Sequence, residues 1–159
     1  MSEVTAQDER YLRESIDAAL EARGRGDHPF GAVLVTAGGR VIRGFNSVVT
    51  DGDPTGHAES NLVRIAAREL TADELRKSTL YSSTEPCAMC AGAIYWARIP
   101  RVVFALSEQG LIAIVSPVSD EPVLDLPSRE VFARGGDVVD VAGPALEVEA
   151  AAVHDGFWG

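Results

Sequence analysis

Apolar positions recur along this chain at two spacings, one typical of amphipathic helices and one typical of short strands. From Thr5 to Arg23 apolar residues return every three or four positions, which predicts an amphipathic helix. Thr5, with Asp8 three residues further on, predicts a capping box at its start. A second helical stripe begins near His57 and continues to about Leu70. The pattern alone therefore predicts two of the longer helices.

Shorter apolar runs, several of them rich in β-branched residues, predict strands between the helices. The predicted strands span residues 30–36, 41–46, 79–83, 101–106 and 138–141, and a glycine-containing turn joins the first two as a hairpin. Further helices are expected at 71–74, directly after Pro86, and from Pro144 to about His154. This alternation predicts an α/β fold, a three-layer α/β/α sandwich around a five-stranded mixed sheet. We expect residues 1–159 to form a single domain, because this length can bury one core and no internal repeat is visible.

The segment from Ser107 to Ser128 does not fit this alternation. It begins with the apolar run 111–115 and continues as an acidic stretch interrupted by prolines. We expect a long connection without regular secondary structure here, and such connections are often functional. Its role stays open at this point, since it can shape a binding pocket or cover a partner subunit.

Two short motifs carry the residues that point to chemistry. His57-Ala58-Glu59 supplies an imidazole and a carboxylate, and Pro86-Cys87-Ala88-Met89-Cys90 supplies both cysteines of the chain. Each motif is expected at the start of a helix, with Thr55 capping the first helix and Pro86 in the first turn of the second. The two cysteines then lie on one helical face. A helix N-terminus also favours the thiolate form that metal binding requires.

The supply of ligands favours a catalytic metal site over a structural one. Catalytic zinc sites use three protein ligands and leave one position for water, whereas structural sites use four. A closed site needs a second histidine, and neither of the other two histidines lies at a short spacing from the motifs. We therefore predict His57, Cys87 and Cys90 as metal ligands, with Glu59 free to act as a general base. A thioredoxin-like redox pair and a purely structural zinc remain alternatives.

The composition of the chain bears on its partners and location. The formal net charge is −10, and no lysine or arginine follows Arg134. Nucleic-acid binding depends on clustered basic residues, so this composition argues against a nucleic-acid partner. No apolar run has the length of a signal peptide or of a membrane span, so no membrane partner is expected. Because both cysteines are assigned to a metal and must stay reduced, we expect a cytoplasmic protein.

The motifs and their surroundings resemble the zinc-dependent cytidine deaminase-like superfamily. Its signature is H-x-E followed by P-C-x-x-C. The resemblance covers roughly residues 5 to 105 in order and spacing, and includes 28–35, 44–46, 79–81 and 91–98. It implies the same three-layer fold, one Zn²⁺ per chain, and a hydrolase that replaces the amino group of a cyclic amidine by oxygen. It also implies that Glu59 moves the proton of the attacking water to the ring nitrogen and to the departing amine.

The resemblance also implies contacts around the reacting atoms. The backbone amides of Ala58 and Cys87 would assist the substrate or metal-bound oxygen, and the backbone carbonyl of Glu85 would accept a hydrogen bond from the amine. Asn46 is expected to contact the edge of the base, since its amide both donates and accepts. Phe30 and Trp96 are expected as walls of the pocket.

The end of the chain resembles that of fungal cytosine deaminases, in which a C-terminal helix brings aromatic and acidic side chains over a small pocket. On that resemblance Asp155, Phe157 and Trp158 are expected to contact the substrate. Phe157 and Trp158 would form a lid, or else they simply anchor the last helix. The sequence does not decide between these two interpretations.

The identity of the substrate depends on which branch the chain resembles. Residues 91–98 resemble guanine deaminases, and residues 85–87 resemble both those and bacterial tRNA adenosine deaminases. We predict deamination of a free nucleobase or a related aminated heterocycle, with cytosine favoured and guanine or an s-triazine next. A tRNA adenosine deaminase and a catalytically silent zinc-binding interaction module remain alternatives. Related small deaminases are commonly dimers, so we expect a homodimer, with Tyr95 and Trp96 on the contact surface.

Overall fold

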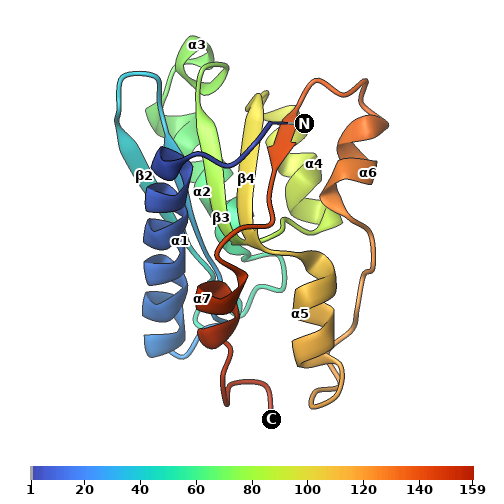
Figure 1. Ribbon diagram of the computed structural model, residues 1–159. Coiled ribbons are helices and arrows are strands. Elements are labelled where there is room, and N and C mark those ends of the chain that lie inside the picture. The colour runs from blue at the N-terminus through green and yellow to red at the C-terminus, as the bar shows by residue number, and fades with distance from the viewer. Residues whose placement is uncertain (1) are drawn as a thin grey trace.

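A mixed β-sheet forms the centre of the molecule (Figure 1). The computed structural model describes residues 2–159, and within them the sheet has five strands in the order β2-β1-β3-β4-β5. Strand β1 is antiparallel to both β2 and β3, whereas β3, β4 and β5 are parallel. The strands are β1 (Gly31–Val35), β2 (Val41–Phe45), β3 (Thr79–Thr84), β4 (Arg101–Leu106) and β5 (Asp140–Ala142). The predicted five-stranded mixed sheet is confirmed.

Helices cover both faces of this sheet (Figure 1). The helices are α1 (Ala6–Gly24), α2 (Ala58–Glu69), α3 (Ala72–Leu75), α4 (Ala88–Trp96), α5 (Glu108–Val115), α6 (Ser128–Ala133) and α7 (Glu147–Ala152). Helices α1, α5 and α7 pack against one face, and α2, α3, α4 and α6 pack against the other. The protein is therefore the three-layer α/β/α sandwich that the sequence predicts.

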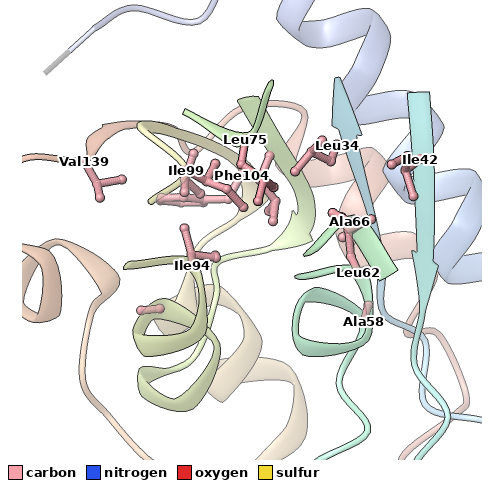
Figure 2. Close-up of a cluster of buried hydrophobic side chains, with 14 of the residues drawn as sticks. Leu34, Ile42, Ala58, Leu62, Ala66, Leu75, Ile94, Ile99, Phe104 and Val139 are labelled. Atoms are coloured by element: carbon pink, nitrogen blue, oxygen red, sulfur yellow. The ribbon is translucent and has the colours of Figure 1, made fainter. Parts of the chain in front are cut away.

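Two buried clusters, one on each face, hold the layers together. Successive side chains of a strand point to opposite faces, and accordingly Val33 joins the α1 cluster while Leu34 joins the α2 cluster. Strand β4 repeats this division with Val103 and Phe104. Figure 2 shows the α2 side, where Leu34, Leu62 and Phe104 come from three different elements. The burial of both faces explains why β1 and β4 are nearly continuous apolar runs.

The buried carboxylate of Asp8 connects helix α1 to the sheet through hydrogen bonds. The predicted capping box is present, with Thr5 and Asp8 bonding each other's backbone amides. Asp8 also accepts hydrogen bonds from Arg101 (2.8 Å) and from the Tyr81 hydroxyl (2.9 Å). Burial alone would raise the pKa of Asp8, but these bonds outweigh it and hold the pKa well below its usual range.

The segment 107–128 is more regular than the sequence pattern predicts. Helix α5 occupies its first part, because Ser107 caps the helix by accepting from the amide of Gly110 (3.0 Å) and the run 111–115 forms its apolar side. Helix α6 begins at Ser128 and is not predicted by the sequence pattern. The expectation of an unstructured connection is therefore wrong for 108–115 and holds only for the residues between the two helices.

The last elements are also displaced from their predicted bounds. Strand β5 covers Asp140–Ala142, because its pairing with β4 begins at Asp140 opposite Arg101, and Val138 before it is 64% exposed. Helix α7 begins at Glu147 instead of Pro144, since Leu146 has a positive φ of 56° that no helix accommodates. The mismatch is confined to the ends of these elements, and their type and order are as predicted.

Candidate metal centre and substrate pocket

The two sequence motifs meet where two helices begin. His57 is the N-cap of α2, and Cys87 is the N-cap of α4. Only Glu85 and Pro86 separate Cys87 from the end of β3. The predicted cap Thr55 does not bond the amides of α2, because its hydroxyl donates to Asp53 instead (2.7 Å). Both helix starts lie where the sequence predicts them.

The three predicted ligands have the spacing that zinc requires. Their donor atoms all lie within 4.8 Å of one another, and the sulfur of Cys87 is 3.5 Å from Nδ1 of His57. Zinc bonds of about 2.3 Å to sulfur and about 2.0 Å to nitrogen, held at a tetrahedral angle, place such a pair about 3.6 Å apart. Two thiolates and one imidazole form a donor set of catalytic zinc sites. Within residues 2–159, the residues present therefore fit zinc held by three protein ligands.

The electrostatics of the cluster favour the ligand form of Cys87. Hydrogen bonds from the Cys90 thiol and from His57 lower the pKa of Cys87, although burial opposes them. The same contact with Cys87 raises the pKa of His57. Because metal ions bind thiolates and not thiols, the acidified Cys87 is prepared for coordination.

Glu59 is buried beside these ligands and does not belong to the donor cluster. Its side chain is 5% exposed, and Oε1 accepts a hydrogen bond from the hydroxyl of Ser82 on β3 (2.5 Å). Burial raises the pKa of Glu59, although the bond from Ser82 opposes this rise. A raised pKa makes this carboxylate a stronger base than an ordinary glutamate, which suits a general acid and base.

A cavity of about 300 Å³ opens beside the donor cluster. This volume is at the lower end for small-molecule sites. Among the residues predicted for the site, the cavity is lined by Phe30, His57, Glu59, Glu85 and Cys87. The other lining residues are not predicted from the sequence, and they are Pro54, Thr84, Met89, Glu108, Leu111, Pro122 and Leu124.

Two of these additional residues bring polar groups to the cavity. Glu108, in the first turn of α5, is 6% exposed, and burial together with the neighbouring Glu85 carboxylate raises the pKa of Glu108 to about 7. The hydroxyl of Thr84 is buried and has no hydrogen-bond partner within residues 2–159. A sequence signal for both existed, because Thr84 and Glu108 lie at or directly after the carboxyl ends of adjacent parallel strands, where α/β sheets bind ligands.

Asn46 and Ala58 lie outside the cavity lining. The side-chain oxygen of Asn46 accepts from the backbone amides of His28 (3.3 Å) and Val48 (3.1 Å), so it shapes the loop after β2. Its acceptor is therefore already engaged, contrary to the expectation of a side chain that both donates to and accepts from a base. Ala58 is fully buried between His57 and Glu59 in the α2 core cluster.

The expectation that Trp96 forms a pocket wall is wrong. Trp96 is 80% exposed at the last residue of α4, whereas Cys87 and Cys90 are at the other end of that helix. With a rise of about 1.5 Å per residue, the helix carries Trp96 about 9 Å further along its axis than Cys90. Trp96 instead contacts Tyr95, with ring centroids 5.2 Å apart.

The aromatic chain end packs behind the pocket wall and does not line the cavity. Trp158 lies against His28 and Phe30, at centroid distances of 5.0 and 6.0 Å, and donates from Nε1 to Nδ1 of His154 (3.1 Å). Phe157 packs on His28 and Trp158. Asp155, in contrast, is exposed. This packing corrects the expected substrate contacts and supports the anchor interpretation, since only Phe30 of this cluster lines the cavity.

The fold and the donor cluster together define a class of protein. A mixed sheet between two helical layers carries a Cys₂His donor set at two helix starts, with a buried carboxylate beside it. These are the features of the zinc-dependent deaminases.

Comparison with known families specifies this class further. Residues 5–106 match the model described as the cytidine and deoxycytidylate deaminase zinc-binding region, and the chain belongs to this family. The predicted family, deaminase class and zinc cofactor are thereby confirmed.

Three relatives show how the similarity is distributed. A Schizosaccharomyces pombe protein named probable cytosine deaminase is 41% identical over 157 residues, which is 99% of this chain and 96% of the relative. Guanine deaminase of Bacillus subtilis is 46% identical over 101 residues, 63% of this chain and 64% of the relative. The tRNA-specific adenosine deaminase of Haemophilus influenzae is 42% identical over 110 residues, 69% of this chain and 64% of the relative.

A solved structure agrees with the sequence comparison. The X-ray structure of the Bacillus subtilis guanine deaminase superimposes with a TM-score of 0.62 and 37% identity, covering 75% of this chain and 82% of that one. Within residues 2–159, none of the helices combines the length and apolar composition needed to cross a bilayer.

Proposed function

We propose that this protein is a hydrolytic deaminase of a free nucleobase or related aminated heterocycle, with cytosine as the favoured substrate. The observation that carries the proposal is the cavity of about 300 Å³ that is lined by Glu59 together with His57 and Cys87 of the donor cluster. Similarity along nearly the whole chain to a protein named probable cytosine deaminase supports cytosine.

The proposed reaction adds water to the amidine carbon, breaks its bond to the amino nitrogen and releases ammonia. His57, Cys87 and Cys90 would hold zinc, which would supply Lewis-acid activation of the water. Glu59 accepts the proton of that water and delivers protons to the ring nitrogen and to the departing amine. Ser82 keeps the carboxylate in place through its 2.5 Å hydrogen bond.

The position of Glu108 in the cavity favours a free base over a nucleoside as the substrate. A carboxylate accepts hydrogen bonds from ring N–H groups, and a protonated carboxyl also donates to a carbonyl oxygen. Free cytosine has an N1–H next to its carbonyl, whereas cytidine has the sugar bond at N1. With a pKa raised to about 7, Glu108 can serve in either state near neutral pH.

Guanine is the second candidate substrate. It is supported by the Bacillus subtilis guanine deaminase, which is similar in both sequence and structure. Deamination of tRNA is less well supported, because the net charge of −10 opposes binding of a phosphate backbone.

The test is ammonia release by zinc-loaded protein with cytosine, guanine, an amino-s-triazine, cytidine and tRNA, each with a chelator-treated control. We expect turnover of cytosine above that of cytidine and tRNA, and no turnover after chelation. Turnover of tRNA without activity on free bases would overturn the proposal. Absence of ammonia with every compound would instead favour the zinc-binding interaction module.

The remaining expectations from the sequence are part of the same proposal. We propose a single-domain cytoplasmic protein, supported by two cysteines that are both thiols in the structure. We also propose a homodimer that uses the surface around Tyr95 and Trp96. Its support is the 80% exposure of a tryptophan, a residue type that is enriched at protein interfaces.

A further inference from the structure

The carboxylate of Glu85 joins the end of β3 to two helices that follow much later in the chain. One oxygen, Oε2, accepts from the backbone amide of Glu108 (2.8 Å). The other, Oε1, accepts from the amide (3.0 Å) and the hydroxyl (2.8 Å) of Ser128, 43 residues further on. The side chain is 7% exposed, so these bonds are shielded from water.

Both amides that Glu85 accepts from belong to first residues of helices. Such amides have no partner within their own helix and need another acceptor. Ser107 satisfies the amide of Gly110 but not that of Glu108. Pro127, the N-cap of helix α6, makes no side-chain capping bond to the amides of that helix. Glu85 therefore completes the start of α5 and the start of α6 at the same time.

The residues between these two anchored positions form one side of the cavity. Helix α5 contributes Glu108 and Leu111, and the following connection contributes Pro122 and Leu124. Leu124 is 58% exposed, so the connection itself has little burial to hold it in place. A further hydrogen bond between α5 and the connection, donated by the side-chain amide of Gln109 to the carboxylate of Asp125, lies on the exposed surface. The buried bonds to Glu85 thus mark both ends of this wall.

We propose that the side chain of Glu85 is a positioning residue that holds α5 and residues 116–127 as the substrate-binding wall, and thereby controls how tightly and how selectively the base binds. This inference rests on the proposed deaminase function and assigns Glu85 a role different from that of its neighbour Cys87. Cys87 faces the donor cluster, whereas the carboxylate of Glu85 faces the two helix starts.

The variant Glu85→Gln tests this role with little change in shape. The amide of glutamine has only one acceptor oxygen, and its NH₂ group would face an N–H donor at one helix start. We expect one zinc per chain as in the wild type, a KM for the substrate raised at least tenfold, and a kcat changed less than threefold. The ratio of kcat/KM for guanine and cytosine should also change. Hydrogen exchange should accelerate at the amides of 108–111 and 128–131.

Ser128→Ala is the matched milder variant, because it removes the 2.8 Å hydroxyl bond and leaves both amide bonds. It should raise KM about two- to threefold and accelerate exchange at the start of α6 more than at α5. Gln109→Ala, which removes the exposed hydrogen bond to Asp125, should leave KM within twofold of the wild type. If Glu85→Gln does not fold, Ser128→Ala decides the question.

Unchanged exchange at both helix starts in Glu85→Gln would overturn the proposal, and so would faster exchange with unchanged KM and selectivity. Loss of zinc at unchanged exchange would assign Glu85 to the metal centre and also overturn it. The exchange measurement needs no turnover. If wild-type protein released no ammonia, the proposed function would fail while the role of Glu85 in holding α5 and α6 would still be measured.

Discussion

At the scale of single residues, the site depends on buried side chains whose polar partners are few and specific. Glu59 has its hydrogen bond from Ser82, and Cys87 has its contacts with Cys90 and His57. In such surroundings a change of one group alters proton affinity strongly, because water cannot compensate. Two predictions follow for residues with different tasks.

The first prediction concerns the proposed proton carrier. Glu59→Gln should lower kcat by about 10²–10⁴-fold, the usual contribution of general acid–base catalysis. Zinc content should stay at the wild-type level, because Glu59 lies outside the donor cluster. Stopped-time ammonia assays with metal analysis check this. Ser82→Ala is the matched control and should reduce kcat by a smaller factor, and full activity of Glu59→Gln would disprove the assigned role.

The second prediction concerns His154, which is buried under the C-terminal aromatic cluster. Burial and then the charge of Arg23 lower the pKa of His154 to about 4, while Asp155 opposes them. Below about pH 6.5 the unfolded chain takes up a proton that the folded protein does not bind until about pH 4. Stability should therefore fall as the pH drops through this window, by up to about 3 kcal/mol from this group.

Denaturant titrations of the wild type and of His154→Asn between pH 7 and pH 4.5 check this. Asparagine keeps an acceptor near the position of Nδ1 for Trp158 and cannot titrate. Because both proteins contain the same zinc ligands, acid effects on the metal centre cancel in the difference. Equal pH dependence of the two proteins would contradict the prediction.

At the scale of elements, the position of α2 against β2 sets the position of the metal centre, since α2 carries Glu59 and has His57 as its N-cap. Gly44 on β2 makes this close packing possible. A Cβ atom at Gly44 would lie 2.6 Å from the carbonyl oxygen of Ala58 and 2.6 Å from Cβ of Leu62. A side chain here would have to push the first turns of α2 away from the sheet.

The prediction at this scale is that Gly44→Ala destabilises the protein by about 1–3 kcal/mol, the usual cost of overpacking. It should also weaken zinc retention, because the first turn of α2 moves with the helix. Chemical denaturation and zinc analysis after dialysis measure the two effects. Gly24→Ala is the control, since the added Cβ meets nothing within 4 Å. A Gly44→Ala protein as stable as Gly24→Ala would contradict the prediction, because it would show that α2 can move away from β2 without loss of stability.

At the scale of the whole molecule, the assembly and the overall charge decide which partners are possible. The net charge of −10 is spread over a surface that also exposes a few large apolar side chains. Trp96 on α4 and Val148 on α7 are the extreme examples, at 80% and 87% exposure, and they belong to opposite helical layers. Only the Trp96 side is proposed as a dimer surface.

The corresponding prediction is that Trp96→Glu changes the mass in solution from dimer to monomer, because a charge in the core of an interface opposes association. Val148→Glu introduces the same charge on the other layer and should leave the dimer intact. Light scattering coupled to size exclusion measures both at matched concentrations. A monomeric wild type, or a Trp96→Glu protein that stays dimeric, would disprove the proposed interface.

Several parts of the fold could be predicted because their causes are local in the chain. The capping boxes at Thr5 and Thr71, the alternation of strands and helices, and the ligand spacing of Cys87 and Cys90 are all properties of short segments. The sequence was misleading where short elements lack a clear period. Helix α5 lies where the sequence predicts no regular structure. Helix α6 is not predicted, because a six-residue helix contains too few turns to show a pattern.

What the sequence by itself determined is the family chemistry: a histidine with an acid two residues further on, and two cysteines three residues apart, each pair placed at a helix start by local backbone geometry. What only the tertiary structure decided is the composition of the pocket. Glu108, Thr84 and Leu124 come together because the carboxyl ends of β3 and β4 are adjacent and Glu85 bonds a residue 43 positions away. Contacts over such separations depend on how the layers pack, and no short-range pattern in the sequence records them.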